Sequence, residues 1–81
     1  MPKTAKLTQW EILADAFHNY PDVIDIRTMC EMLGGISEKT GYKLLRENRI
    51  FHFKIGKAFR VPKMNIISFL ISQAEDFENK E

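Results

Sequence analysis

The sequence has a single cysteine, Cys30, in 81 residues, so no disulfide can form within the chain. A secreted domain of this size would normally need several disulfides, and the sequence therefore predicts a cytoplasmic protein. No apolar run approaches the ~18 residues of a membrane span, and no signal-peptide core follows Met1-Pro2-Lys3. We expect one domain with no membrane partner, because 81 residues leave no room for a second core.

The sequence also lacks the residue sets that catalysis and metal binding require. His18 and His52 have no cysteine or carboxylate at ligand spacing, which argues against a zinc site. It contains neither a Ser/His/Asp set nor a glycine-rich phosphate loop, and a chain this short offers little pocket. We therefore expect no enzyme, no metal and no cofactor. Cys30 has core spacing with Met29 and Leu33, so we expect a packed thiol.

The net charge is small, but the charged residues are unevenly distributed along the chain. The whole chain carries only +1. Residues 36–63 hold eight Lys or Arg against two acids, a net charge of +6, while the residues before and after them sum to −2 and −3. A neutral protein with one basic third has the electrostatic footprint of a polyanion-binding face. The alternative is chance clustering on a solvated surface, and the positions of the cations on the elements bear on that choice.

A capping box predicts the first helix. Thr8 caps its start and Glu11 closes the box three residues later. Pro21 ends the run, because the residue before a proline avoids helical geometry, and an extended Val23-Ile24 follows. We expect the first helix to lie on the last one, with a core that includes Trp10, Phe17, Ile66 and Phe69. The alternative is that part of this apolar face is exposed and pairs two protomers.

Two short helices joined by glycines are predicted next. Asp25 caps a helix through Leu33, which Gly34-Gly35 stops in the left-handed conformation. Ser37 caps a helix from Glu38 to about Asn48. At about 100° per residue, one side of this helix carries Gly41, Leu44, Leu45 and Asn48. The opposite side carries three cations flanked by Tyr42, and these cations are Lys39, Lys43 and Arg46.

An alternating stretch predicts a β-hairpin with the two-residue loop Gly56-Lys57, which is typical of a type II′ turn. We expect Lys54 and Arg60 to point one way, Lys57 to lie at the tip, and the other face to carry Phe53, Ile55, Phe59 and Val61.

Pro62 suits the first turn of a final helix. The expected apolar stripe of that helix is Met64, Ile67, Leu70, Ile71, Ala74 and Phe77, widened by Ile66 and Phe69. Arg49 and Lys63 are expected to be solvated. Residues 1–6 and the acidic tail 75–81 are expected to be loose, and the tail has the charge to engage a basic partner.

Two short helices with a tight glycine turn, a hairpin and a supporting helix make up a winged helix-turn-helix. The predicted fold class is mainly α with a small β-hairpin wing and an additional N-terminal helix. A helix fits the major groove of B-DNA, where basic side chains meet phosphates and guanine edges. Ser37 and the free amides beside it are placed to hold a phosphate.

Residues 25–45, DIRTMCEMLGGISEKTGYKLL, resemble the helix-turn-helix of the excisionase family, a relative of the MerR-type winged helix. Residues 53–62, FKIGKAFRVP, resemble the wing of that family. The resemblance covers residues 23–72. It implies DNA contacts from Ser37, Lys39, Thr40, Tyr42, Lys43 and Arg46, and wing contacts from Lys54, Lys57 and Arg60. For Tyr42, contact with a phosphate and packing against the wing both remain open.

The resemblance implies an accessory factor that binds and bends double-stranded DNA at the end of a mobile element. Such a factor directs a site-specific recombinase, an integrase, toward excision. Because a single module of this size should bind DNA modestly, cooperative self-association on DNA or a partner protein is expected. Two alternatives remain: a small transcriptional regulator that binds a promoter operator, and a protein-interaction adaptor that does not bind DNA.

Three positions depart from the family pattern. A second glycine in Gly34-Gly35 is expected to change the angle between the two helices. Gly41 stands where a small apolar residue is usual, and it should cost about 0.5–1 kcal/mol relative to alanine. Ala58 stands where the wing often has another base, so the wing is expected to grip DNA less tightly.

Overall fold

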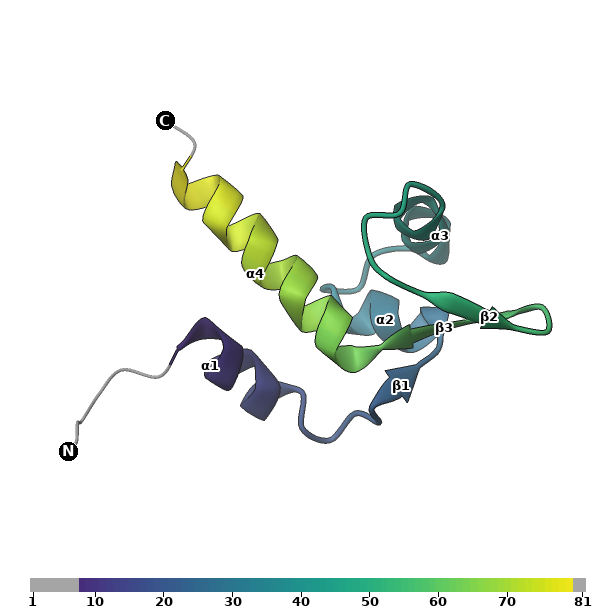
Figure 1. Ribbon diagram of the computed structural model, residues 1–81, viewed down its shortest axis with the longest axis horizontal. Coiled ribbons are helices and arrows are strands. Elements are labelled where there is room, and N and C mark those ends of the chain that lie inside the picture. The colour runs from purple at the N-terminus through teal and green to yellow at the C-terminus, as the bar shows by residue number, and fades with distance from the viewer. Residues whose placement is uncertain (1–7, 80–81) are drawn as a thin grey trace.

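The computed structural model describes residues 8–79, with side chains to Asp76. These residues form four helices and a small three-stranded antiparallel sheet in one mixed α/β domain (Figure 1). The elements in chain order are α1 (Gln9–Ala16), β1 (Val23–Ile24), α2 (Ile26–Met32), α3 (Glu38–Arg46), β2 (Phe53–Ile55), β3 (Ala58–Pro62) and α4 (Lys63–Asn79). Every helix expected from the sequence is present, and so is the hairpin.

The sheet contains one strand pairing that the sequence did not predict. Its order is β1-β3-β2, so the extended Val23-Ile24 joins the hairpin as a third strand, with Ile24 opposite Val61. Pro62 lies in β3 opposite Val23, and α4 begins only at Lys63, so the expectation of a helical Pro62 was wrong. The pairing between β2 and β3 ends where Phe53 lies opposite Arg60, so Pro62 has no partner residue in β2. A strand position with a partner on one side only tolerates the missing N–H of proline.

The turn between α2 and α3 uses both of its glycines. Gly34 has φ +96° and Gly35 has φ +86°, in the left-handed region where side chains are strained. The Gly35 amide donates to the Cys30 carbonyl at 2.9 Å, which closes the end of α2. The second glycine is therefore a conformational requirement of this turn.

Gly41 lies where α3 crosses α2. A Cβ built at this position would stand 2.6 Å from the Cys30 Sγ and 3.2 Å from the Met29 Cε. The glycine thus permits the two helices to approach closely, so crowding of a side chain at this position opposes the helix-propensity cost that the sequence predicts for glycine. Cys30 is the packed thiol that the sequence predicts, with 4% of its surface exposed.

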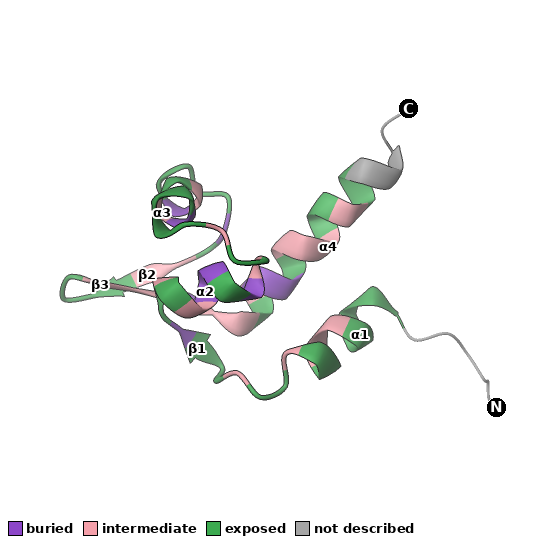
Figure 2. Ribbon diagram, turned by 180° about the vertical axis from the view of Figure 1, so that it is seen from behind, coloured by how far each residue is buried: buried purple, intermediate pink, exposed green. Residues whose placement is uncertain are grey.

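The core is built by the middle of the chain and the start of α4 (Figure 2). Asn48 does not belong to it: α3 ends at Arg46, and Asn48 is exposed with φ +57°. Leu44 is half-buried, whereas Leu45 on the same side of α3 is fully buried. The buried apolar side chains are Ile24, Met29, Cys30, Met32, Leu45, Ile50, Val61, Ile66 and Ile67.

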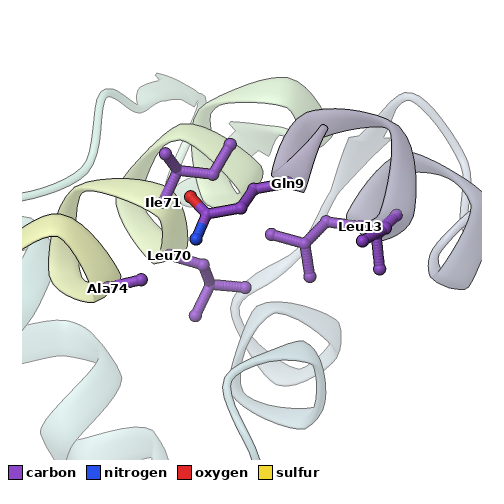
Figure 3. Close-up of a pocket in the computed structure, with 6 residues that line it drawn as sticks. Gln9, Leu13, Leu70, Ile71 and Ala74 are labelled. Carbon is purple, nitrogen blue, oxygen red and sulfur yellow. The ribbon is translucent and has the colours of Figure 1, made fainter. Parts of the chain in front are cut away.

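Helix α1 lies along α4, as the sequence predicts, but none of its residues is buried. Its capping box forms as expected, since the Thr8 hydroxyl accepts from the Glu11 amide at 3.1 Å and the Thr8 amide donates to the Glu11 carboxylate at 2.9 Å. Trp10, expected in the core, is 39% exposed. Apolar side chains of the two helices face each other across an open hollow (Figure 3).

Helix α4 extends beyond its apolar stripe. It continues to Asn79, so residues 75–79, for which the sequence indicated a loose tail, are part of the helix. Met64, expected on the buried stripe, is 58% exposed. Residues 1–6, 80 and 81 and the side chain of Phe77, for which the sequence made predictions, lie outside the part that the structure describes.

Candidate nucleic-acid interface

The start of α3 is held by its capping residue. The Ser37 hydroxyl accepts from the Thr40 amide at 3.1 Å and donates to the Thr40 hydroxyl at 3.0 Å. Both side chains are exposed. The Ser37 carbonyl accepts from the Gly41 amide at 3.0 Å and lies 3.5 Å from the Cys30 Sγ, so this cap is tied to the α2–α3 crossing.

Helix α3 has one buried side and one cationic side. Gly41 and Leu45 are buried against the rest of the domain, while Lys39, Lys43 and Arg46 are all exposed. At about 100° per residue, the three cations fall within an arc of about 60° that lies opposite Gly41 and Leu45. The expected arrangement of three cations on one outward face is therefore present in the structure.

An acidic side chain stands at the edge of this face. Glu38 lies in the first turn of α3, where a carboxylate is favoured by the helix dipole. Its carboxylate is 3.9 Å from the guanidinium of Arg27 on α2, and both side chains are largely exposed, so the pair contributes little to stability. Arg27 precedes the basic segment 36–63 in the sequence, so its proximity to α3 was not foreseen.

Tyr42 packs against the hairpin. Its ring lies edge-on to the ring of Phe59 on β3, with centroids 5.5 Å apart, and the ring of His52 contacts Phe59 in the same manner at 5.5 Å. Of the two roles left open for Tyr42, packing against the hairpin is the one this geometry supports. Three rings thus join the cationic helix to the hairpin, and this cluster was not predicted from the sequence.

The register of the hairpin corrects the expected distribution of its side chains. Ile55 pairs with Ala58, Lys54 with Phe59 and Phe53 with Arg60. Residues directly opposite each other in an antiparallel pair share a face, so Lys54 lies with Phe59, and Arg60 lies with Phe53. The expectation that Lys54 and Arg60 point the same way was wrong. The two-residue loop alone determines this pairing, so the sequence contained the information.

The two strand cations therefore have different surroundings. The Lys54 Nζ lies 5.1 Å above the Phe59 ring, on the face that Tyr42 of α3 also contacts. Arg60 is half-buried on the other face, where its guanidinium donates to the Phe59 carbonyl at 3.1 Å. Lys57 is exposed in the loop, after a Gly56 with φ +63°, as a type II′ turn requires.

Asp25, the cap of α2, lies near Arg60. Its carboxylate accepts from the Thr28 amide at 2.9 Å. This hydrogen bond is the main reason that the pKa of Asp25 lies below its ordinary value, and the positive charge of Arg60 adds to the effect. Arg60 thus has an electrostatic role beside the start of α2, on the face away from the three rings.

Two further cations have structural positions. The Lys63 Nζ donates to the Tyr20 carbonyl at 2.8 Å and to the Phe17 carbonyl at 3.3 Å, and its side chain is only 17% exposed, so the expectation of a solvated Lys63 was wrong. Arg49 is exposed, with its guanidinium 5.6 Å from the centroid of the Phe69 ring on α4. Neither side chain belongs to the cationic face of α3.

No protein-family model, curated protein or solved structure matches this chain. Within residues 8–79, no group of three or more His, Cys, Asp or Glu is placed to hold a metal ion. The helices in the same range are too short or too polar to cross a bilayer. The functional interpretation therefore depends on the arrangement of this chain's own side chains.

The predicted site residues fall into two groups. One surface, formed by α3 and the facing side of the hairpin, brings together Ser37, Lys39, Thr40, Tyr42, Lys43, Arg46 and Lys54, with Lys57 in the adjoining loop. Arg60 stands apart on the reverse face of the hairpin. A polyanion that lies along α3 would meet the first group and not Arg60.

Proposed function

We propose that this chain is a winged helix-turn-helix protein that binds double-stranded DNA in a sequence-specific manner. In this proposal α2 and α3 are the helix-turn-helix, and β2 and β3 are the wing. One observation carries it: Lys39, Lys43 and Arg46 are exposed together on the side of α3 opposite its buried anchor, Leu45. A helix that presents such a face fits the major groove, where its cations meet phosphates and guanine edges.

The wing supplies secondary contacts in this proposal. Lys54 is held above Phe59 on the side of α3, so its ammonium is close to the same DNA. Lys57 follows in the exposed loop and meets the adjacent backbone. Ser37 and Thr40 add hydroxyls at the start of α3. We expect Arg60 to contribute least to affinity among the proposed contacts, because it lies on the reverse face.

The biological role proposed is that of an excisionase-like accessory factor, which rests on the resemblance of residues 25–45 and 53–62. A single module of this size buries about 600–1,000 Å² on DNA. A lone copy should therefore bind modestly, and repeated sites or a partner protein would raise its occupancy. Footprinting separates the roles: phased sites beside a recombination site support excision, and a single promoter operator supports transcriptional regulation.

The experiment that tests DNA binding compares cations on and off the α3 face. Binding of a selected duplex is measured by fluorescence anisotropy over a range of salt concentrations. We expect Lys43→Ala and Arg46→Ala each to cost about 1–3 kcal/mol of binding free energy and to lower the salt slope by about one. Arg49→Ala removes the same charge off the α3 face, beside Phe69, and should leave both quantities close to wild type.

Circular dichroism and thermal melting of each variant establish that the fold is retained. If Lys43→Ala and Arg46→Ala bind as wild type does, α3 is not the DNA-contacting element. If the affinity of the wild type does not fall with salt, the chain acts as an adaptor and the proposal is wrong.

A further inference from the structure

Three side chains surround the Phe59 ring on the side of the hairpin that faces α3. Tyr42 comes from α3, Lys54 comes from β2, and His52 is the residue directly before β2. The Tyr42 and His52 rings each lie 5.5 Å from the Phe59 ring, centroid to centroid, and the Lys54 Nζ lies 5.1 Å from the same centroid. His52 therefore belongs to the surface that carries the proposed DNA contacts, although the sequence did not predict it there.

One ring nitrogen of His52 is held by the backbone. The Nδ1 atom lies 3.0 Å from the carbonyl oxygen of Ile50. A carbonyl oxygen only accepts hydrogen bonds, so Nδ1 carries a proton and donates it to this oxygen. The neutral ring is then the tautomer whose lone pair is on Nε2, and a further proton can bind only there.

The Nε2 atom of His52 reaches solvent. It makes no hydrogen bond to the residues that the structure describes, and no buried side-chain nitrogen or oxygen atom among those residues lacks a partner. Nε2 is therefore not a buried atom. The two ion pairs of the described residues do not include His52 either. A positive charge on Nε2 would thus add to that of Lys54 without an acidic partner from this part of the chain.

The interaction of Nε2 with a phosphate depends on its protonation. In the neutral ring Nε2 is an acceptor, as a phosphate oxygen is, so the two cannot form a hydrogen bond. In the protonated ring Nε2–H is a charged donor, and charge-assisted hydrogen bonds to phosphate are about twice as strong as neutral ones. Histidine is the side chain that ordinarily changes its charge between about pH 5 and 8, and lysine and tyrosine do not.

We propose that His52 is a further DNA contact of this chain, in which protonated Nε2 donates to a phosphate of the duplex backbone beside Lys54. The hydrogen bond to Ile50 and the Phe59 ring hold the imidazole in place, so less side-chain freedom is lost on binding than for a mobile lysine. This inference rests on the proposed function, because it adds a residue and a pH dependence to the same interface. Binding is then tighter in mild acid than in mild base.

The pH dependence of DNA affinity tests this contact. Anisotropy of a duplex selected from a random pool, with a dye that does not titrate in this range, is measured at about pH 5.5 and about pH 8. We expect the wild type to bind about tenfold more tightly at the lower pH, as one additional hydrogen bond from a charged donor would give. The salt slope should be steeper there by about one, because one more phosphate is neutralised.

Two substitutions separate the charge of His52 from its packing. His52→Gln has a polar side chain without charge, and its affinity should be the same at both pH values and close to that of the wild type at pH 8. His52→Lys has a permanent charge, so it should also be independent of pH but should bind more tightly and with a steeper salt slope than His52→Gln. If the ring had only a structural role, both variants would be weakened alike. Circular dichroism at both pH values establishes that each variant is folded.

His18, the only other histidine, is the matched control. Its Nδ1 also lies against a backbone carbonyl, that of Asp15, at 2.7 Å. His18 is exposed just beyond the end of α1, and α1 lies along α4, apart from α3 and the hairpin (Figures 1 and 2). His18→Gln should therefore keep the pH dependence of the wild type.

The outcomes distinguish this proposal from DNA binding itself. An affinity that is equal at the two pH values, or a pH dependence that persists in His52→Gln or disappears in His18→Gln, would overturn the role of His52. Binding by the cations of α3 would stand in each of these cases. The absence of binding to the duplex at either pH would overturn both proposals.

Discussion

The α2–α3 crossing and the α1–α4 contact each join two helices, and they are packed in different ways. At the crossing, Gly41 lets α3 approach until the thiol of Cys30 fills the space between the backbones. Met29 and Leu45, beside it, are almost completely buried. At the α1–α4 contact, α1 contributes no buried residue, and hollows remain on the surface.

This difference in packing bears on the proposed function of α3. If α3 contacts DNA as proposed, close packing of its other face holds its cations in a fixed geometry. The α1–α4 contact, in contrast, leaves apolar side chains of both helices uncovered. The net charge is also unevenly distributed, because residues 36–63 carry +6 while the residues before and after them carry −2 and −3. Predictions that compare the two contacts test this difference directly.

The largest expected effect is on the buried anchor of α3. Leu45→Ala should destabilise the domain by about 2–5 kcal/mol, because a fully buried leucine leaves a cavity. Leu13→Ala, on the half-buried face of α1, should cost about 1 kcal/mol, because its side chain is only partly removed from water. Urea unfolding measures both. Equal losses would mean that α1 packs as closely as α3 does.

Gly41→Ala tests the close approach itself. We expect a loss of about 1–3 kcal/mol from overpacking against the Cys30 Sγ, despite the better helix propensity of alanine. Cys30→Ala removes the atom in conflict, so the double variant should be more stable than the two single losses predict. Urea unfolding of the four proteins gives the coupling energy. A stabilising Gly41→Ala would show that the helices do not approach this closely.

Lys63→Met tests what holds α1 in place. The ammonium donates to two carbonyls just beyond the end of α1, and its loss should cost about 1–2 kcal/mol, since hydrogen bonds from a charged group are worth more than neutral ones. Hydrogen exchange should accelerate in α1 and stay unchanged in α3. Lys57→Met, the same change in the exposed hairpin loop, serves as control. Faster exchange throughout the domain would show that α1 is not a separate unit.

The sequence predicted the elements well because their signals are local. Thr8, Asp25 and Ser37 cap the three helices as expected, since each acts on an amide three residues away. The cationic face of α3 was also predicted, because helical periodicity alone determines which residues share a side.

The errors concern long-range packing. Nothing local to Val23-Ile24 specifies β3 as its partner, and nothing in residues 38–46 shows that Gly41 lies against Cys30. Lys63 was expected to be solvated because its carbonyl partners lie more than forty residues earlier in the chain. The wrong expectation for Lys54 and Arg60 is different in kind, because the loop length already determined on which face of the hairpin each side chain lies.

The smallest expected effect concerns the pH dependence of the helix caps. Asp25 at the start of α2 accepts the Thr28 amide as a charged group, which lowers its pKa below the ordinary value of 3.8. Its contribution to stability is complete above that value and is lost as the pH falls through the lower pKa of the folded state. Asparagine caps equally well and does not titrate, so Asp25→Asn is the control.

The stability difference between wild type and Asp25→Asn should shrink between pH 7 and pH 3 in urea unfolding. At α3 the Ser37 hydroxyl accepts the Thr40 amide and donates to the Thr40 hydroxyl, with no carboxylate in the cap, so Ser37→Ala should lower stability by a similar amount at both pH values. A wild-type advantage over Asp25→Asn that persists unchanged at pH 3 would show that the Asp25 charge does not stabilise the start of α2. The α2–α3 crossing would then be stabilised by the packing around Gly41 and Leu45 and not by the charge of Asp25.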